Sequence, residues 1–191
     1  MPETRETILQ VARRLFVRQG YTATSIRQIA EEVGIGKATI YHHFPDKRAI
    51  IMALLKGVTE RQKTIFEAIS VEANPRRRIE LAVTTGTRFL LEDMDVIQIV
   101  RRELPDGRAQ MQFTSMTFLK EFRRLLCDAI RQGVEHGTFR PIDPADGARV
   151  LMTMIQGTFA VTYLSGEYPS SPEEASAALL DVFFNGIEKH A

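Results

Sequence analysis

The segment VGIGKATIYHHF, residues 33 to 44, gathers the side chains of this sequence that are most able to do chemistry. Lysine, threonine, tyrosine and two histidines can exchange protons, bind a metal ion, or donate hydrogen bonds to phosphates and bases. A metal site is disfavoured, because adjacent helical residues such as His42 and His43 point about 100° apart. No nearby cysteine or suitably spaced carboxylate completes a ligand set, so we expect no metal and no cofactor.

A catalytic site has no better support elsewhere in the chain. The single cysteine, Cys127, falls on the apolar side of a long helical pattern, where an inert buried thiol is expected. The sequence contains no phosphate-binding loop, no metal-ligand spacing and no nucleophile beside a suitable base. We therefore expect no enzyme, and we keep a small-ligand-binding helical protein or enzyme without a DNA role as the alternative.

Charge is distributed unevenly along the 191 residues, whose net charge is +1. Residues 1 to 50 hold eight Lys or Arg and five Asp or Glu, so the N-terminal end carries the positive surplus. This surplus indicates a polyanionic partner at that end. The opening MPETRETILQ does not resemble a secretory signal, and no apolar run reaches membrane-spanning length, so we expect a cytoplasmic protein without a membrane partner.

Helical periodicity runs through nearly the whole chain and predicts an all-α fold of about nine helices. Three helices should end near Gly20, Gly34 and Pro45, the second of them starting with a Ser25–Gln28 capping box. The later helices are expected at about 46–70, 76–92, 94–104, 108–136, 145–166 and 172–189. The last two are apolar on more than one face, which predicts that a second subunit covers them.

The second and third predicted helices have helix-turn-helix spacing. Counting from Ile26, Ala30 is the fifth residue, Gly34 the ninth and Ile40 the fifteenth. Ala30 is small where the next helix crosses at close range, and Gly34 suits a turn that needs a positive φ. The third helix is then left with a small polar face that fits a major groove.

The string TSIRQIAEEVGIGKATIYHHFPDK, residues 24 to 47, resembles the DNA-binding signature of the tetracycline-repressor (TetR/AcrR-like) family. The shared features are the leading Thr, the Ile-Ala pair, the Val-Gly-Ile turn, the Thr-Ile-Tyr run, and Phe44 followed by Lys47. The resemblance implies a helix-turn-helix DNA-binding head at 1–48 and a ligand-binding and dimerisation body at 49–191. It also implies a sequence-specific regulator, a repressor that a small, largely apolar ligand releases from its operator.

The resemblance assigns DNA-contacting roles by position. The expected contacts are Thr24, Ser25, Arg27, Gly36, Lys37, Ala38, Thr39, Tyr41, His42 and Lys47. Phosphates are expected at Thr24, Ser25, Tyr41, Lys47 and the amides that start the fourth helix, whereas Arg27 could reach a guanine. Gly36 and Ala38 depart from the commoner residues of the family, a Ser-type cap and a Gly, which leaves the base preference open.

The C-terminal body holds five of the seven methionines and many of the phenylalanines. Ordinary core packing is one explanation; a cavity that accepts varied apolar ligands is the other, and the resemblance favours it. The expected lining residues are Phe89, Met94, Arg101, Met116, Phe122, Phe159 and Tyr163. The expected partners are therefore a near-palindromic double-stranded operator, a small-molecule effector, and a second copy of the chain bound through the last two helices.

Overall fold

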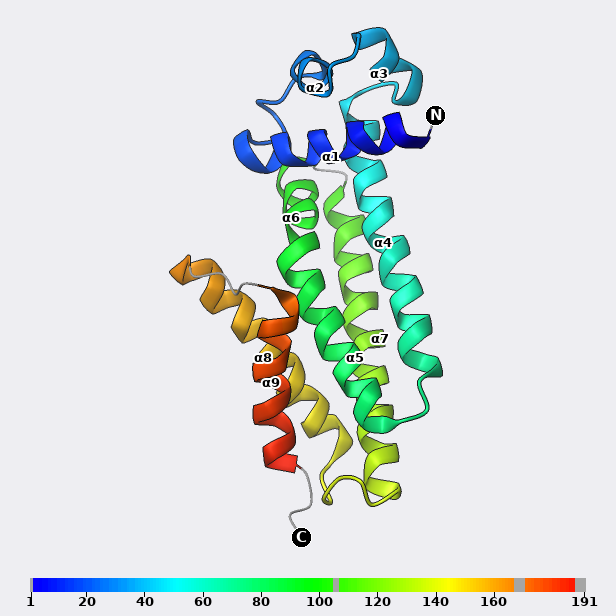
Figure 1. Ribbon diagram of the computed structural model, residues 1–191, viewed down its shortest axis with the longest axis vertical. Helices are drawn as coiled ribbons and strands as arrows, with labels where there is room; N and C mark the ends of the chain where they lie inside the picture. Colours follow the sequence, from blue (N-terminus) through cyan, green and yellow to red (C-terminus); the bar gives the residue numbers. More distant parts are fainter. Residues whose placement is uncertain (1, 105–106, 167–170, 188–191) are drawn as a thin grey trace. The chain divides into compact units, whose positions relative to one another are not determined.

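The computed structural model describes residues 2–104, 107–166 and 171–187 (Figure 1). These residues form no β-strand, and their helices confirm the all-α prediction. In chain order they are α1 (Pro2–Gln19), α2 (Ile26–Val33), α3 (Lys37–His43), α4 (Lys47–Val71), α5 (Pro75–Arg88), the π-helix η1 (Phe89–Asp93), α6 (Met94–Glu103), α7 (Gly107–Glu135), α8 (Pro144–Ser165) and α9 (Pro172–Ile187). The helix expected at 76–92 thus ends early, because its last turn has π rather than α hydrogen bonding.

The chain divides into two compact units. Unit 1 comprises Met1–Gln62 and Met94–Thr114, and unit 2 comprises Lys63–Asp93 and Ser115–Ala191. Unit 1 therefore combines the N-terminal helices with α6, which is far from them in the sequence. The functional division expected after residue 48 stays a prediction.

Unit 1 has an apolar core that α1, α2, α3 and the first turns of α4 share. Ile8, Leu15, Ile29, Ile40 and Ile50 are almost completely buried there. The helix spacing of these residues along α1 and α2 is the reason they can meet on one side of each helix.

A charged contact ties α6 to α1 inside unit 1. Arg13 donates from Nε to Asp95 Oδ2 at 3.1 Å and from Nη2 to Asp95 Oδ1 at 2.8 Å. This two-bond geometry is the strongest arrangement available to an arginine and a carboxylate. It fixes the first turn of α6 against the N-terminal helices.

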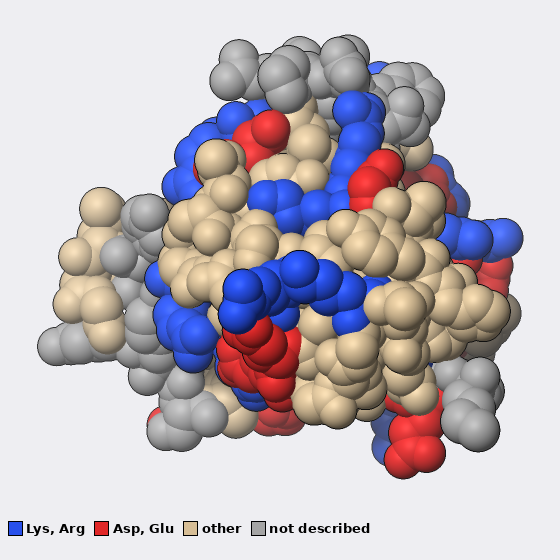
Figure 2. Space-filling model, turned by 90° about the horizontal axis from the view of Figure 1, so that it is seen from above, with Lys and Arg blue, Asp and Glu red and all other residues tan. Residues whose placement is uncertain are grey.

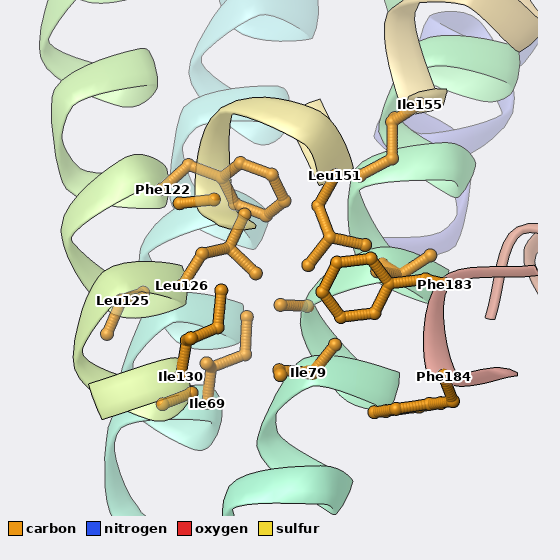
Figure 3. Packing of buried hydrophobic residues seen from close by; sticks show 14 of the residues in the cluster. Ile69, Ile79, Phe122, Leu125, Leu126, Ile130, Leu151, Ile155, Phe183 and Phe184 are labelled. Carbon is orange, nitrogen blue, oxygen red and sulfur yellow. The ribbon is translucent and has the colours of Figure 1, made fainter. Parts of the chain in front are cut away.

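Unit 2 is built around a second apolar core (Figure 3). Phe122, Leu126, Leu151 and Phe183, from α7, α8 and α9, point toward one another in this core. A Cβ built on Gly86 of α5 would lie 2.9 Å from the ring of Phe122, so any larger residue at this position would require the ring to shift. The core therefore joins side chains that lie more than a hundred positions apart in the sequence, from Ile69 to Phe184.

The arginines at the start of α5 have three different environments. Arg76 pairs with Glu80 at 3.1 Å and lies 4.1 Å above the ring of Phe184, whereas Arg77 is exposed. Arg78 is buried and donates three hydrogen bonds to neutral oxygens elsewhere in unit 2. Of the three arginines, Arg76 thus forms an ion pair, Arg77 is solvated, and Arg78 connects segments of unit 2 through buried hydrogen bonds.

None of the described helices is both long enough and apolar enough to cross a membrane.

Candidate nucleic-acid interface

The first half of the helix-turn-helix begins with a local capping network. Ser25 is the N-cap of α2, and its hydroxyl oxygen accepts a hydrogen bond from the Gln28 N–H at 3.2 Å. In return, the side-chain oxygen of Gln28 accepts from the Ser25 N–H at 2.8 Å. Two amide donors that a helix start would leave unpaired are therefore satisfied, which confirms the predicted capping box.

The turn between α2 and α3 depends on a glycine. Gly34 has φ 80° and ψ 30°, in the left-handed region where a Cβ is costly. Its N–H and that of Ile35 both donate to the Ala30 carbonyl oxygen at 3.0 Å. Ala30 is only 2% exposed, which agrees with the prediction that the next helix crosses close to it.

The third helix separates an inner apolar side from an outer polar side. Ile40 and the capping residue Phe44 are buried in the core of unit 1. On the outer side, Lys37, Ala38, Tyr41 and His42 are exposed, and Thr39 is half-buried. The predicted outward face of residues 37 to 42 is therefore present, with Gly36 as an exposed N-cap that provides no side-chain hydrogen bond.

Several arginines and lysines of unit 1 lie on the surface that Figure 2 views from above. Arg27 is exposed and pairs with Glu31 at 2.6 Å, one helical turn further on. The hydrogen bond to Glu31 raises the pKa of Arg27 from its already high ordinary value. Within the described part of the chain, no carboxylate is paired with Lys37, which leaves its charge available at the start of α3.

The two adjacent histidines of α3 lie edge to face, with ring centroids 5.3 Å apart. Across the part of the chain that the structure describes, no group of three or more His, Cys, Asp or Glu is placed to hold a metal ion.

Two of the residues expected to contact phosphate are placed differently from the expectation. Thr24 is 1% exposed, and its hydroxyl donates to the Gly20 carbonyl at 2.8 Å. Lys47 directs Nζ to the carbonyl oxygens of Tyr21 at 2.6 Å, Thr24 at 2.7 Å and Thr22 at 3.4 Å. Both side chains hold the turn between α1 and α2, because the backbone acceptors of that turn converge on them.

The start of α4 also differs from the expected anion site. The carboxylate of Asp46 accepts a hydrogen bond from the Ala49 N–H at 2.7 Å. A negative side chain therefore already occupies one of the free amides that a phosphate would need.

The surroundings of Lys47 are partly desolvated. Burial lowers the pKa of Lys47, and the negative charge of Glu103 opposes that shift. Burial likewise raises the pKa of Tyr21, whose ring centre lies 4.4 Å from the Lys47 ammonium. Lys47 and Tyr21 are both half-buried, which is the physical cause of the two desolvation shifts.

The residues expected to line a ligand site fall in several places. In unit 2, the rings of Phe122 and Phe118 stack, with centroids 5.7 Å apart and planes 8° apart. The ring centroid of Phe89 lies 4.8 Å from that of Phe118. Phe66 completes this group at 5.1 Å from Phe118. Sequence reasoning missed Phe66 and Phe118, although Phe118 precedes Phe122 by one helical turn and thus shares its face of α7.

The other ligand candidates have different environments. Met94 and Arg101 belong to unit 1, and Arg101 is exposed. Met116 is 50% exposed, and Phe159 is half-buried on α8. The side chain of Tyr163 lies outside the described residues.

Comparison with known proteins shows what this arrangement is similar to. The family model "Bacterial regulatory proteins, tetR family" matches residues 8–54, and "Tetracyclin repressor-like, C-terminal domain" matches residues 72–187. The chain is 30% identical over 138 residues to the HTH-type transcriptional repressor KstR2 of Rhodococcus jostii, covering 71% of this chain and 68% of that protein.

Solved structures of the same fold cover nearly the whole chain. The ketosteroid transcriptional regulator KstR2 of Mycobacterium tuberculosis matches with a TM-score of 0.71 and 24% identity, over 97% of this chain and 95% of that one. A regulator from Saccharomonospora viridis, solved in complex with choline, matches with a TM-score of 0.71 and 26% identity over 100% of both chains. The chain therefore belongs to the tetR family of bacterial regulatory proteins, and it is a DNA-binding transcriptional regulator rather than an enzyme.

Proposed function

We propose that α3 enters the major groove of an operator and that its outer side reads the bases. Lys37, Ala38, Thr39 and His42 would meet base edges, while Ser25 and Tyr41 contact the flanking phosphates. The observation that carries this proposal is the division of α3 into a buried side at Ile40 and an exposed polar side. A helix held in this way by apolar contacts presents its polar side without losing its own packing.

Arg27 is a further candidate for a phosphate or guanine. Its ion pair with Glu31 is exposed on both sides, with side-chain exposures of 71% and 60%. Exposed pairs of this kind contribute little to stability. The guanidinium can therefore exchange Glu31 for a nucleic-acid acceptor at small cost, and bidentate donation to guanine is the strongest option available to it.

A homodimer would present two such helices to one operator. Large apolar side chains remain exposed on the last two helices, including Val161 at 65%, Leu164 at 84% and Val182 at 64%. Apolar surface that is this exposed favours association with a second copy. The two-fold symmetry of the pair then predicts a near-palindromic operator with half-sites about one helical turn or more apart.

The aromatic group of unit 2 is the proposed place for a small, largely apolar effector. Phe66, Phe89, Phe118 and Phe122 come from α4, η1 and α7, and only Phe122 among them is fully buried. Aromatic rings that are half-buried can pack against an apolar ligand without opening the main core. Binding of the effector at this site would release the repressor from its operator. The protein would act in the cytoplasm, where the operator lies.

The size of the proposed ligand response follows from general allosteric coupling. A difference of about 1–3 kcal/mol between the two states changes operator affinity by about 5–150-fold. A thermal-shift screen of sterols, fatty acids, acyl thioesters and quaternary amines would identify an effector, which is then titrated into the protein–operator complex. A Phe118→Leu variant should respond to the same effector only at higher concentration, and an unchanged response would exclude the aromatic group.

The DNA-binding proposal is tested on an operator selected from random duplexes by the wild-type protein. Lys37→Ala and His42→Ala should each weaken operator binding by about 5–150-fold and relax the base preference at one position per half-site. Lys63→Ala is the matched control, since this lysine is 81% exposed in unit 2 and pairs only along its own helix with Glu67. Wild-type affinity and base preference in both α3 variants would refute the docking.

A further inference from the structure

The turn between α1 and α2, residues 20 to 24, is held from one side by Lys47. The three protons of its ammonium point to three carbonyl oxygens of the turn: Tyr21 at 2.6 Å, Thr24 at 2.7 Å and Thr22 at 3.4 Å. The ring of Tyr21 lies 4.4 Å from the same nitrogen and provides a cation–π contact. The half-buried ammonium therefore has two short hydrogen bonds and one longer, exposed one to its own chain, and a phosphate would compete with these carbonyl acceptors.

The same turn is also held by Glu103, the last residue of α6. The Thr22 hydroxyl donates to Glu103 Oε2 at 2.6 Å, across 81 positions of sequence. The other oxygen of this carboxylate accepts from Arg102 Nε at 2.8 Å, which orients it toward the turn. We call the set of Lys47, Thr22 and Glu103 the turn clamp.

The turn clamp is adjacent to the candidate DNA-binding surface. Thr24, the last residue of the turn, offers its carbonyl to Lys47 and its hydroxyl to Gly20. The next residue is Ser25, which caps α2, and α2 carries α3 through the Gly34 turn. The position of the turn therefore determines the position of the first backbone amides of α2.

We propose that Lys47 and Glu103 are positioning residues for DNA binding, which act on the operator through the α1–α2 turn rather than by direct contact. Lys47 organises the carbonyls of the turn, and Glu103 couples the end of α6 to Thr22. A displacement of the C-terminal end of α6 would release Thr22 and loosen the start of α2. This assignment rests on the proposed docking of α2 and α3 to DNA.

The alternative is that Lys47 binds a phosphate directly, and the salt dependence of operator affinity separates the two roles. Each phosphate contact contributes about 0.9 to the slope of log affinity against log salt, so a dimer that loses two contacts loses about 1.8. A positioning residue changes the affinity and leaves that slope as it is. Lys47→Met keeps the length of the side chain and removes its donors.

The experiment measures operator affinity at five salt concentrations for wild type, Lys47→Met, Thr22→Val, Glu103→Ala and Glu103→Gln. We expect Lys47→Met to lower affinity at least about tenfold on a parallel salt line, and Thr22→Val and Glu103→Ala by about fivefold each, the equivalent of one hydrogen bond. Glu103→Gln retains an acceptor for Thr22 and should recover most of the loss. The Thr22→Val/Glu103→Ala double variant should be no weaker than either single variant, because both changes remove one interaction.

Hydrogen exchange of the free protein gives a readout that does not depend on DNA. The amides of residues 22 to 25 should exchange faster in Lys47→Met and Thr22→Val, with α4 as the internal reference for folding. Thr22 is exposed, so its valine variant tests the clamp even where Lys47→Met fails to fold.

A slope reduced by about 1.8 in Lys47→Met, with wild-type exchange in the turn, would overturn the positioning role of Lys47. Wild-type affinity and exchange in Thr22→Val and Glu103→Ala would overturn the role of Glu103. If instead the Lys37 and His42 variants bind the operator like wild type, the docking fails, while the exchange result still reports on the clamp.

Discussion

Arg78 offers a test of how unit 2 is held together, because it is a buried cation whose hydrogen bonds go only to neutral oxygens. Nε donates to the Glu72 carbonyl at 2.9 Å, Nη1 to Gln132 Oε1 at 3.2 Å and Nη2 to the Ser70 carbonyl at 3.3 Å. These acceptors belong to the end of α4, the following loop and α7. Arg78→Met keeps the apolar stem and removes all three donors.

The expected loss follows from counting these bonds. A typical internal hydrogen bond contributes about 1 kcal/mol net, so three bonds give about 3 kcal/mol of unfolding free energy. In the variant, water can partly replace the lost donors at the Ser70 and Glu72 carbonyls, since Ser70 is exposed and Glu72 is half-buried. Gln132 is also only half-buried, so the loss should not reach the larger values seen when a buried charge is left without its partner.

The assay is chemical denaturation followed by circular dichroism at a fixed protein concentration, since dimerisation makes stability depend on concentration. Arg77→Met is the matched control: it removes one exposed positive charge from the neighbouring position, and the backbone N–H of residue 77 keeps its bond to Asn74 at 3.1 Å. Arg78→Met should unfold at clearly lower denaturant, and Arg77→Met close to wild type. Equal midpoints for the two variants would refute the assignment of Arg78 as an internal connector.

Three further predictions concern unit 1. Gly34→Ala should cost about 1–2 kcal/mol by denaturation, because its Cβ meets no atom within 4 Å and only the φ of +80° is penalised; an unchanged midpoint would contradict this. Gly36→Ser should stabilise α3 by a few tenths of a kcal/mol, because the serine hydroxyl adds the N-cap acceptor that glycine lacks. Slower hydrogen exchange of the Thr39 amide would support this prediction, and faster exchange would contradict it. The hydrogen bonds from Thr22 and Arg102 hold the pKa of Glu103 below its ordinary 4.5. Glu103 therefore stabilises the fold above pH 4.5, and this contribution is lost as the pH falls through the lowered pKa. Thr22→Val should raise this pKa in a carbon-13 titration of the carboxyl, and an unmoved midpoint would show that the hydroxyl has no such effect.

The features that sequence reasoning predicted correctly depend on neighbours along the chain. The capping box joins Ser25 to Gln28, and the Gly34 turn closes on Ala30, so both interactions lie within one helical turn. The outward polar side of α3 follows in the same way from the burial of Ile40. Local spacing is sufficient here because the partners are always three or four residues apart.

The features that sequence reasoning did not reach depend on partners from distant segments. The position of Lys47 at the end of the DNA-binding signature predicts a phosphate ligand. In the structure, however, its hydrogen-bond acceptors lie in a turn 23 to 26 positions earlier. In the same way, the run of three arginines does not by itself show that Arg78 is the buried one of the three and that it donates to Gln132, 54 positions later.

The sequence by itself determined the helices, their caps, the helix-turn-helix and the side chains that α3 turns outward, because periodicity and capping act over one turn of a helix. Only the tertiary structure decided that Lys47 donates to the α1–α2 turn, that Glu103 meets Thr22, and that Phe66, Phe89, Phe118 and Phe122 form one group. Each of these depends on which backbone or ring the fold brings close. The pairs Lys47–Thr24 and Thr22–Glu103 are 23 and 81 positions apart, so no local spacing in the sequence predicts them.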